Sequence, residues 1–128
     1  MQKLKTDLAS CDTVKFANST GVEIAAESMH QEGKLIGVAI QKTAALAEGV
    51  LVYRAPSRGV AVPCPADATG VFSVGDAAFY DAENKQVVNN AGKSGCIYCG
   101  NALEAAVQAD TEVVIDLDGA SAKGVAES

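Results

Sequence analysis

Short apolar runs alternate with turns rich in Gly, Asn, Asp and Ser along most of the chain. The clearest example is the stretch 72–88. Within it, residues 77–80 have the small and aromatic character of a strand, residues 81–85 form a polar loop, and residues 86–88 return as a second strand. Alternation would place Phe79 on one face and Tyr80 on the other. This stretch predicts a β-hairpin.

Seven further segments of strand length carry the same type of pattern. They are residues 13–16, 22–24, 35–40, 50–54, 60–65, 96–99 and 111–117. The first two are predicted to pair as a hairpin across the turn 18–21, and residues 25–32 are expected to be a loop or a single helical turn. Two Ala-rich segments, 43–49 and 101–110, are predicted crossovers. Many short strands with frequent turns predict an all-β fold, a small barrel or sandwich.

The domain organisation follows from the length and from the two ends of the chain. With 128 residues and 13.0 kDa, the chain is expected to form one domain. We expect an exposed N-terminal arm at 1–12, a β domain at 13–120 and a C-terminal tail at 121–128. Gly33, Leu35 and Ile36 recur later as Gly95, Ile97 and Tyr98. This recurrence fits either a duplicated half-barrel or a common β-loop-β pattern.

Charge and composition limit the classes of function. Sixteen acidic against ten basic residues give a net charge of −6, the wrong sign for neutralising phosphates, so direct nucleic-acid binding is not expected. No apolar run approaches the ~20 residues of a membrane-spanning helix, and residues 1–7 lack the apolar region of a signal peptide. We therefore expect a soluble protein that is not exported. Aromatic residues are only 5% of the chain, so Val, Ile, Leu and Ala must fill the core.

The cysteines offer the most specific candidate chemistry. Cys96 and Cys99 have the C-x-x-C spacing of thiol oxidoreductases and of half a zinc site. A redox pair needs a first thiol whose pKa is lowered at a helix N-terminus, whereas this pair lies in an apolar, strand-like run. A zinc site would need Cys11, Cys64 or His30 as partners, and none forms a second close pair. We expect free thiols with a packing role.

The other candidate motifs are incomplete. Gly92-Lys93-Ser94 resembles the end of a phosphate-binding loop, but the glycine that this loop requires five residues earlier is Val87. The lone His30 has no nucleophile marked by local sequence and is expected at a surface or interface. Aspartates lie mostly at turns, where they bind nearby backbone. No catalytic, cofactor-binding or metal-binding residue is predicted.

The ordered series of motifs between about Cys11 and Gly119 resembles the capsid cement, or decoration, proteins of tailed phages. The segments that carry the resemblance are 33–39, 47–50, 58–63, 72–81, 95–98 and 109–115. Some members of this family were formerly labelled predicted recombinases, a label that the missing phosphate-binding loop does not support. The chain departs from the family pattern at Cys96 and Cys99, where small or aliphatic residues are expected, and in its longer polar N-terminus.

The resemblance implies a structural virion protein without catalytic residues or cofactors. It would be made in the host cytoplasm, form a homotrimer, and bind the major capsid protein on the outer surface of the expanded head. Leu4, Leu8 and Cys11 are apolar positions in the polar arm, and we expect them to contact the capsid; a terminus without a partner is the other interpretation. The alternative function is a small cytosolic metal-binding or thiol-redox module that uses Cys96 and Cys99.

Overall fold

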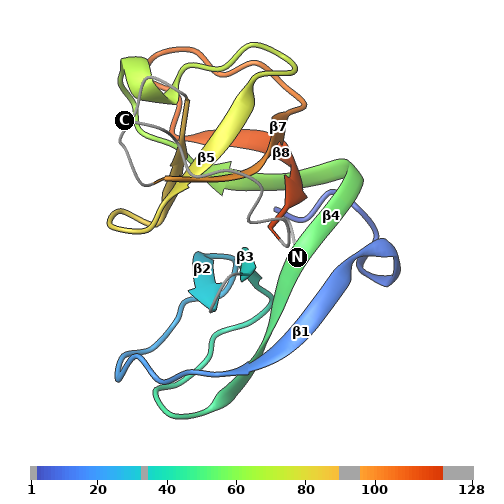
Figure 1. Ribbon diagram of the computed structural model, residues 1–128, viewed down its shortest axis with the longest axis vertical. Coiled ribbons are helices and arrows are strands. Elements are labelled where there is room, and N and C mark those ends of the chain that lie inside the picture. The colour runs from blue at the N-terminus through green and yellow to red at the C-terminus, as the bar shows by residue number, and fades with distance from the viewer. Residues whose placement is uncertain (1–2, 33–34, 90–95, 120–128) are drawn as a thin grey trace.

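The computed structural model describes residues 3–32, 35–89 and 96–119 (Figure 1). Its strands form one antiparallel sheet that is nearly closed into a barrel, which confirms the all-β prediction. The strands are β1 (Asp12–Ala17), β2 (Met29–Glu32), β3 (Leu35–Ala39), β4 (Glu48–Pro63), β5 (Ala77–Asp81), β6 (Gln86–Val88), β7 (Ile97–Ala102) and β8 (Glu112–Asp118). Within these ranges the helical segments are two 3-10 turns, Leu8–Ser10 and Ala68–Gly70.

The sheet is ordered β2-β3-β4-β8-β7-β5-β6, and β1 pairs with β4 outside this path. The hairpin predicted at 72–88 is present as β5 and β6, with Tyr80 opposite Val87. The predicted pairing of 13–16 with 22–24 is wrong. Residues of β1 pair instead with β4, with Phe16 opposite Gly49. Residue 24 makes only an isolated bridge, to Thr43.

β4 is a single bent strand of 16 residues that runs through both parts of the molecule (Figure 1). It pairs with β1 and β3 before the bend and with β8 on both sides of it. Ser57 and Gly59 adopt positive φ angles of 75° and 71° in the bend. The sequence predicted two strands with a turn at 55–59. The strand continues because neighbouring segments bind its backbone: the Gly59 carbonyl oxygen accepts a hydrogen bond from the Lys5 amide at 2.8 Å.

Residues 29–32, expected in a loop or helical turn, form strand β2. Met29 pairs with Val38 and His30 with Gly37 on β3. Both Met29 and His30 are buried, at 1% and 5% exposure. The local sequence favours a loop or a helical turn only weakly, and pairing with the apolar strand β3 makes the segment a strand instead. Tertiary context commonly decides the structure of short strands in this way.

Aliphatic side chains from every part of the sheet fill the main core, as the composition predicts. Its largest members include Ile36, Val52, Val62, Ile115 and Leu117, and two aromatics, Phe72 and Tyr80, pack with them. A smaller cluster of Phe16, Ile24, Ala39 and Leu51 lies under β1. Burying side chains of this size contributes about 1.5–3 kcal/mol each.

Two pairs of turns share the same backbone hydrogen bonding. In the first turn pair (residues 22–28 and 41–47), Ile24 and Thr43 exchange two hydrogen bonds, of 2.9 and 2.8 Å. In the second turn pair (residues 71–76 and 103–110), Phe72 and Ala106 exchange two, both of 2.9 Å. The two turn pairs lie at opposite ends of the molecule (Figure 1).

The match extends from the turn pairs into β3 and β7, the strands that lead into the second turn of each pair. The carbonyl oxygen of Ala39 accepts from the Glu27 amide, and that of Ala102 accepts from the Gly75 amide, each at 2.8 Å. Leu35, which belongs to the recurrent sequence, begins β3, and its counterpart Ile97 begins β7. The two parts of the sheet are therefore alike in backbone geometry. Gly33 and Gly95 of the same recurrence lie outside the described residues.

Candidate functional site

Cys96 and Cys99 are buried and free, with exposures of 4% and 0%. A register shift in the pairing of β5 with β7 places Cys99 between Tyr98 and Gly100 as the extra residue of a bulge. Complete burial raises the pKa of the Cys99 thiol to about 12. A thiol of this pKa is protonated at neutral pH and is a poor nucleophile, the opposite of what a redox pair requires.

The other two cysteines lie elsewhere. Cys64 is buried, and burial, with Asp110 and Glu112 nearby, raises the pKa of its thiol to about 11. Cys11 is half-buried in the N-terminal segment, and burial is again the main reason that its pKa is raised. Among residues 3–32, 35–89 and 96–119, no three His, Cys, Asp or Glu side chains are grouped closely enough to hold a metal ion.

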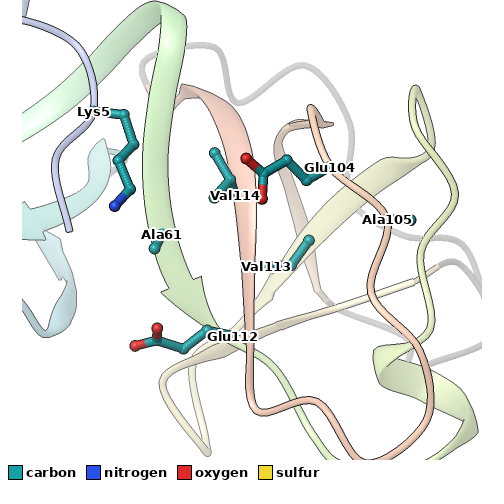
Figure 2. Close-up of a pocket in the computed structure, with 7 residues that line it drawn as sticks. All are labelled: Lys5, Ala61, Glu104, Ala105, Glu112, Val113 and Val114. Carbon is teal, nitrogen blue, oxygen red and sulfur yellow. The ribbon is translucent and has the colours of Figure 1, made fainter.

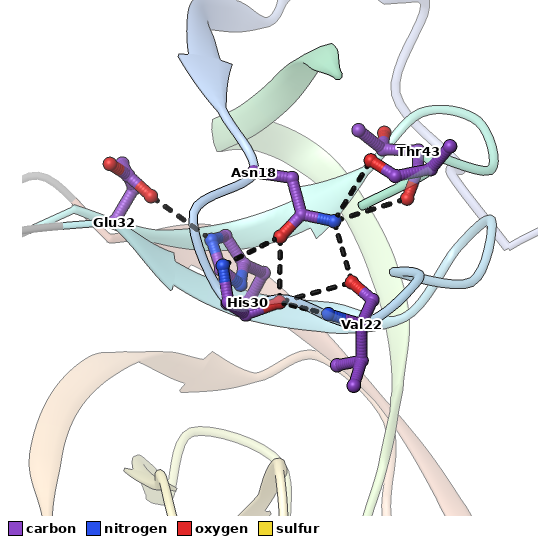
Figure 3. Close-up of polar contacts among 7 residues, drawn as sticks. Asn18, Val22, His30, Glu32 and Thr43 are labelled. Carbon is purple, nitrogen blue, oxygen red and sulfur yellow. Dashed lines mark hydrogen bonds and ion pairs between the residues drawn. The ribbon is translucent and has the colours of Figure 1, made fainter. Parts of the chain in front are cut away.

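His30, which was expected at a surface or interface, is buried in this chain, at 5% exposure. Its ring stacks on Phe16 with centroids 4.9 Å apart. Figure 3 shows its other contact, in which Nε2 lies 3.2 Å from a carboxylate oxygen of Glu32. It lines a hollow of about 310 Å³ with Tyr80 and Lys85, among others. These contacts occupy both the face and the edge of the ring and account for its position.

Asn18 is a buried polar side chain, 1% exposed, that makes several hydrogen bonds. Its amide nitrogen donates to the carbonyl oxygens of Val22, Thr43 and Ala44, at 2.7, 3.2 and 3.1 Å (Figure 3). Its side-chain oxygen accepts from the Thr20 amide at 3.1 Å. Asn18 therefore satisfies the backbone of the first turn pair, which is a structural role.

A second hollow, of about 290 Å³, lies between the N-terminal segment, β4, β8 and the loop before β8 (Figure 2). Its lining is Lys5, Ala61, Glu104, Ala105, Glu112, Val113 and Val114. Glu112 forms an ion pair with Lys3, whose Nζ lies 2.6 Å from the carboxylate. The hollow combines small apolar side chains with the charged residues Lys5, Glu104 and Glu112.

The aspartates bind backbone at turns, as predicted. Asp76 accepts from the Ser73 amide at 2.8 Å, and Asp110 accepts from the Val107 amide at 2.9 Å. Hydrogen bonds from Thr69 lower the pKa of Asp67. The Gly92-Lys93-Ser94 motif lies outside the described residues.

The candidate contact residues of the N-terminal arm differ in their surroundings. Leu4 bridges to Val60 on β4 and packs against the main core. Cys11 also packs against that core, and its thiol lies 3.4 Å from the Asp7 carbonyl oxygen. Leu8, in the 3-10 turn, is 48% exposed. The structure therefore does not bring the three together as one surface, and of the three Leu8 is the most accessible to a partner.

Sequence reasoning missed a set of exposed apolar side chains on the two turn pairs. Val22 and Leu46 lie on the first, and Val71, Val74 and Val107 on the second, with exposures between 37% and 83%. The signal in the sequence is a large aliphatic residue inside a segment otherwise typical of a turn or crossover. Such residues are candidates for contact with another protein.

Comparison with known proteins gives one match. A family model described as phage cement protein matches residues 8–117, which covers β1 to β7 and all but the last residue of β8. No curated protein and no solved structure gives a significant match. Among the described residues there is also no helix long and apolar enough to cross a membrane. Because the family model spans most of the chain and the fold agrees with the fold expected for it, the chain belongs to the phage cement protein family.

Proposed function

We propose that the chain binds the outer surface of an expanded phage head and stabilises it by contacting the major capsid protein. The observation that carries this proposal is the family match over 8–117. The proposed role is structural rather than catalytic. The raised pKa of the buried Cys99 thiol argues against the alternative of a redox module.

The test is addition of the purified chain to expanded heads that lack it. We expect the chain to sediment with the heads in a saturable manner and to raise the temperature at which they lose their DNA. Unexpanded proheads are the control, and we expect them to bind less of the chain. Heads that neither bind the chain nor gain stability would contradict the proposed function.

The proposed assembly state is a homotrimer. β1, β2 and β6 each pair with one strand among those described, and association of chains would cover sheet edges and bury further apolar surface. Light scattering measures this directly. A monomer of 13.0 kDa at micromolar concentration would contradict it.

The N-terminal segment is proposed to contribute to attachment. Lys3 and Lys5 tie it to β4, because the Lys3 carbonyl oxygen accepts from the Ala61 amide at 2.8 Å and the Lys5 amide binds Gly59. Leu8 follows at an exposed position. Three such segments on one trimer would act together at a threefold site, so that individually weak contacts give strong binding.

A further inference from the structure

The exposed apolar side chains of the described residues are not scattered over the surface. Six large hydrophobic side chains are exposed, and five of them lie on the two turn pairs; Leu8 is the other. Single exposed aliphatic residues are normal on a soluble protein, but their concentration on two matching structures at opposite ends is not expected from chance exposure.

On the second turn pair, the backbone fixes the direction of the valines. Phe72 and Ala106 form the antiparallel bridge and are buried, at 2% and 1% exposure. Their neighbours Val71 and Val107 stand next to each other on the opposite side, because side chains alternate along a strand. Val107 is 63% exposed, and Val74, in the turn beyond Phe72, is 69% exposed.

This turn pair is also held in place before any partner arrives. The Asp76 carboxylate binds the Ser73 amide and the Asp110 carboxylate binds the Val107 amide, so each turn is closed by its own side chain. The Asn101 side chain donates to the Gly75 carbonyl oxygen at 3.0 Å and ties the first of these turns to β7. A rigid surface loses little conformational entropy on binding.

On the first turn pair, Leu46 combines two unfavourable features. It has a positive φ of 64°, where the Cβ atom of any residue other than glycine is disfavoured, and it is 83% exposed. Glycine would remove the strain at this position, and burial in this chain does not compensate for it. Val22, 59% exposed, belongs to the same turn pair. Strain at an exposed apolar residue favours a role in contact with another molecule.

Charge indicates the chemistry of the partner. The second turn pair carries Asp76, Glu104 and Asp110 beside its valines, all exposed. A second copy docked through the same surface would oppose these carboxylates to themselves, which is unfavourable. A protein surface with an apolar recess bordered by Lys or Arg would match both the valines and the carboxylates.

We propose that the two turn pairs are two docking surfaces for such a protein and that one chain bridges two copies of it. This inference rests on the proposed function, in which the partner is the major capsid protein. The aliphatic residues at each end enter a recess of a different capsid subunit, and the carboxylates of the second turn pair meet a basic rim on the subunit that they contact.

The experiment measures binding of three variants to expanded heads by sedimentation. The double variant Val74→Asp/Val107→Asp adds charge to the second turn pair, Leu46→Gly removes the side chain from the first, and the third variant combines all three changes. Ser57→Asp, at the exposed bend of β4 away from both ends, is the control for added charge. Thermal melting and light scattering establish folding and assembly state.

We expect each single-end variant to weaken head binding by about tenfold or more, as for contact residues at the centre of an interface, and the combined variant to bind below detection. Leu46→Gly should melt at the same temperature as the wild type or higher, because it relieves the strain of the positive φ. Weaker binding by this variant would then come from the lost side-chain contact and not from unfolding. Ser57→Asp should bind like the wild type. Raising the salt concentration should weaken wild-type binding.

Several results would overturn the inference. A combined variant that binds within about threefold of the wild type would show that the turn pairs are not contact surfaces. A combined variant that changes the assembly state in light scattering would assign them to contacts between copies of this chain. Wild-type protein that fails to bind heads would overturn the proposed function and this inference together, whereas the first two results leave the proposed function intact.

Discussion

Gly37 of β3 and Gly100 of β7 hold matching positions in the two parts of the sheet, each with its Cα against a backbone carbonyl of the next strand. A Cβ at Gly37 would overlap with the carbonyl oxygen of Val52, and a Cβ at Gly100 with that of Asp116. Neither contact can be relieved by rotating a side chain. The close approach of β3 to β4 and of β7 to β8 therefore depends on glycine.

Replacing Gly37 by Ala should destabilise the protein by about 2 kcal/mol or more, because the two strands must separate to admit the methyl group. Chemical denaturation measures this free energy of unfolding. The matched control is Gly21→Asn. Gly21 has a φ of 80° and open space around it, and Asn tolerates that conformation, so we expect a change within about 0.5 kcal/mol. Equal stability of the two variants would contradict the packing described here.

Asn18→Ala should cost about 2–3 kcal/mol, because the carbonyl oxygens of Val22, Thr43 and Ala44 would lose a buried donor. Asn89→Ala is the comparison. Asn89 also binds two carbonyl oxygens, of Ala68 and Val71, but at a position that water reaches more easily, so a smaller loss is expected. Urea denaturation of the two variants checks the order, and a larger loss for Asn89→Ala would contradict it.

Cys99→Ala should cost roughly 1 kcal/mol or somewhat more at pH 7, as a small change in a packed core. This cost should shrink as the pH rises above about 9. In the unfolded chain the thiol of Cys99 ionises near its ordinary pKa of 9.0, whereas the folded thiol stays protonated up to about 12. Between these values the unfolded state has lost a proton that the native state keeps, so Cys99 lowers stability with rising pH, by at most about 1.4 kcal/mol per pH unit.

Unfolding in urea at pH 7, 9 and 10, with wild type and Cys99→Ala in parallel, measures that trend. The difference between the two proteins cancels the titration of the groups that they share. A difference that stays constant or grows with pH would show that the Cys99 thiol is accessible to solvent. In the native protein, thiol reagents should also modify Cys99 more slowly than the half-buried Cys11.

Leu8→Asp should weaken binding to expanded heads and leave the fold and the assembly state unchanged, because this side chain is 48% exposed in the N-terminal segment. Removing residues 1–10 should have the same effect on head binding, but it also deletes Leu4, which packs against the core, and should therefore lower the melting temperature. Sedimentation with heads compares the variants. Unchanged binding of Leu8→Asp would show that attachment lies in the β body alone.

The fold class was predictable because its signals are local. The strand alternation around Phe79 and Tyr80 and the polar loop after them specify a hairpin whatever the rest of the chain does. The partner of β1 was not predictable in the same way, since Phe16 pairs with Gly49 across more than thirty residues and several strands had a suitable pattern. The continuation of β4 through its bend was not predictable from residues 55–59, because Lys3 and Lys5, which bind its backbone there, lie far away in the sequence.

In the candidate site, too, features set by local sequence were predictable, and features set by contacts between distant segments were not. The inert role of Cys99 followed from its apolar surroundings in the sequence, and the pKa of about 12 agrees with it. The exposure of Val71 and Val107 could not be read from sequence, because it follows from the bridge between Phe72 and Ala106. Leu4 was expected to be free for a partner, but its bridge to Val60 places it against the core.

The most direct test of the account is a cryo-electron microscopy reconstruction of expanded heads with and without the added chain. The account predicts extra density on the outer surface only, shaped as three copies of this β domain around a threefold position, with both turn pairs of each copy touching capsid protein. Absence of added density from the outer surface of saturated heads would contradict the central claim that this cement family member binds there.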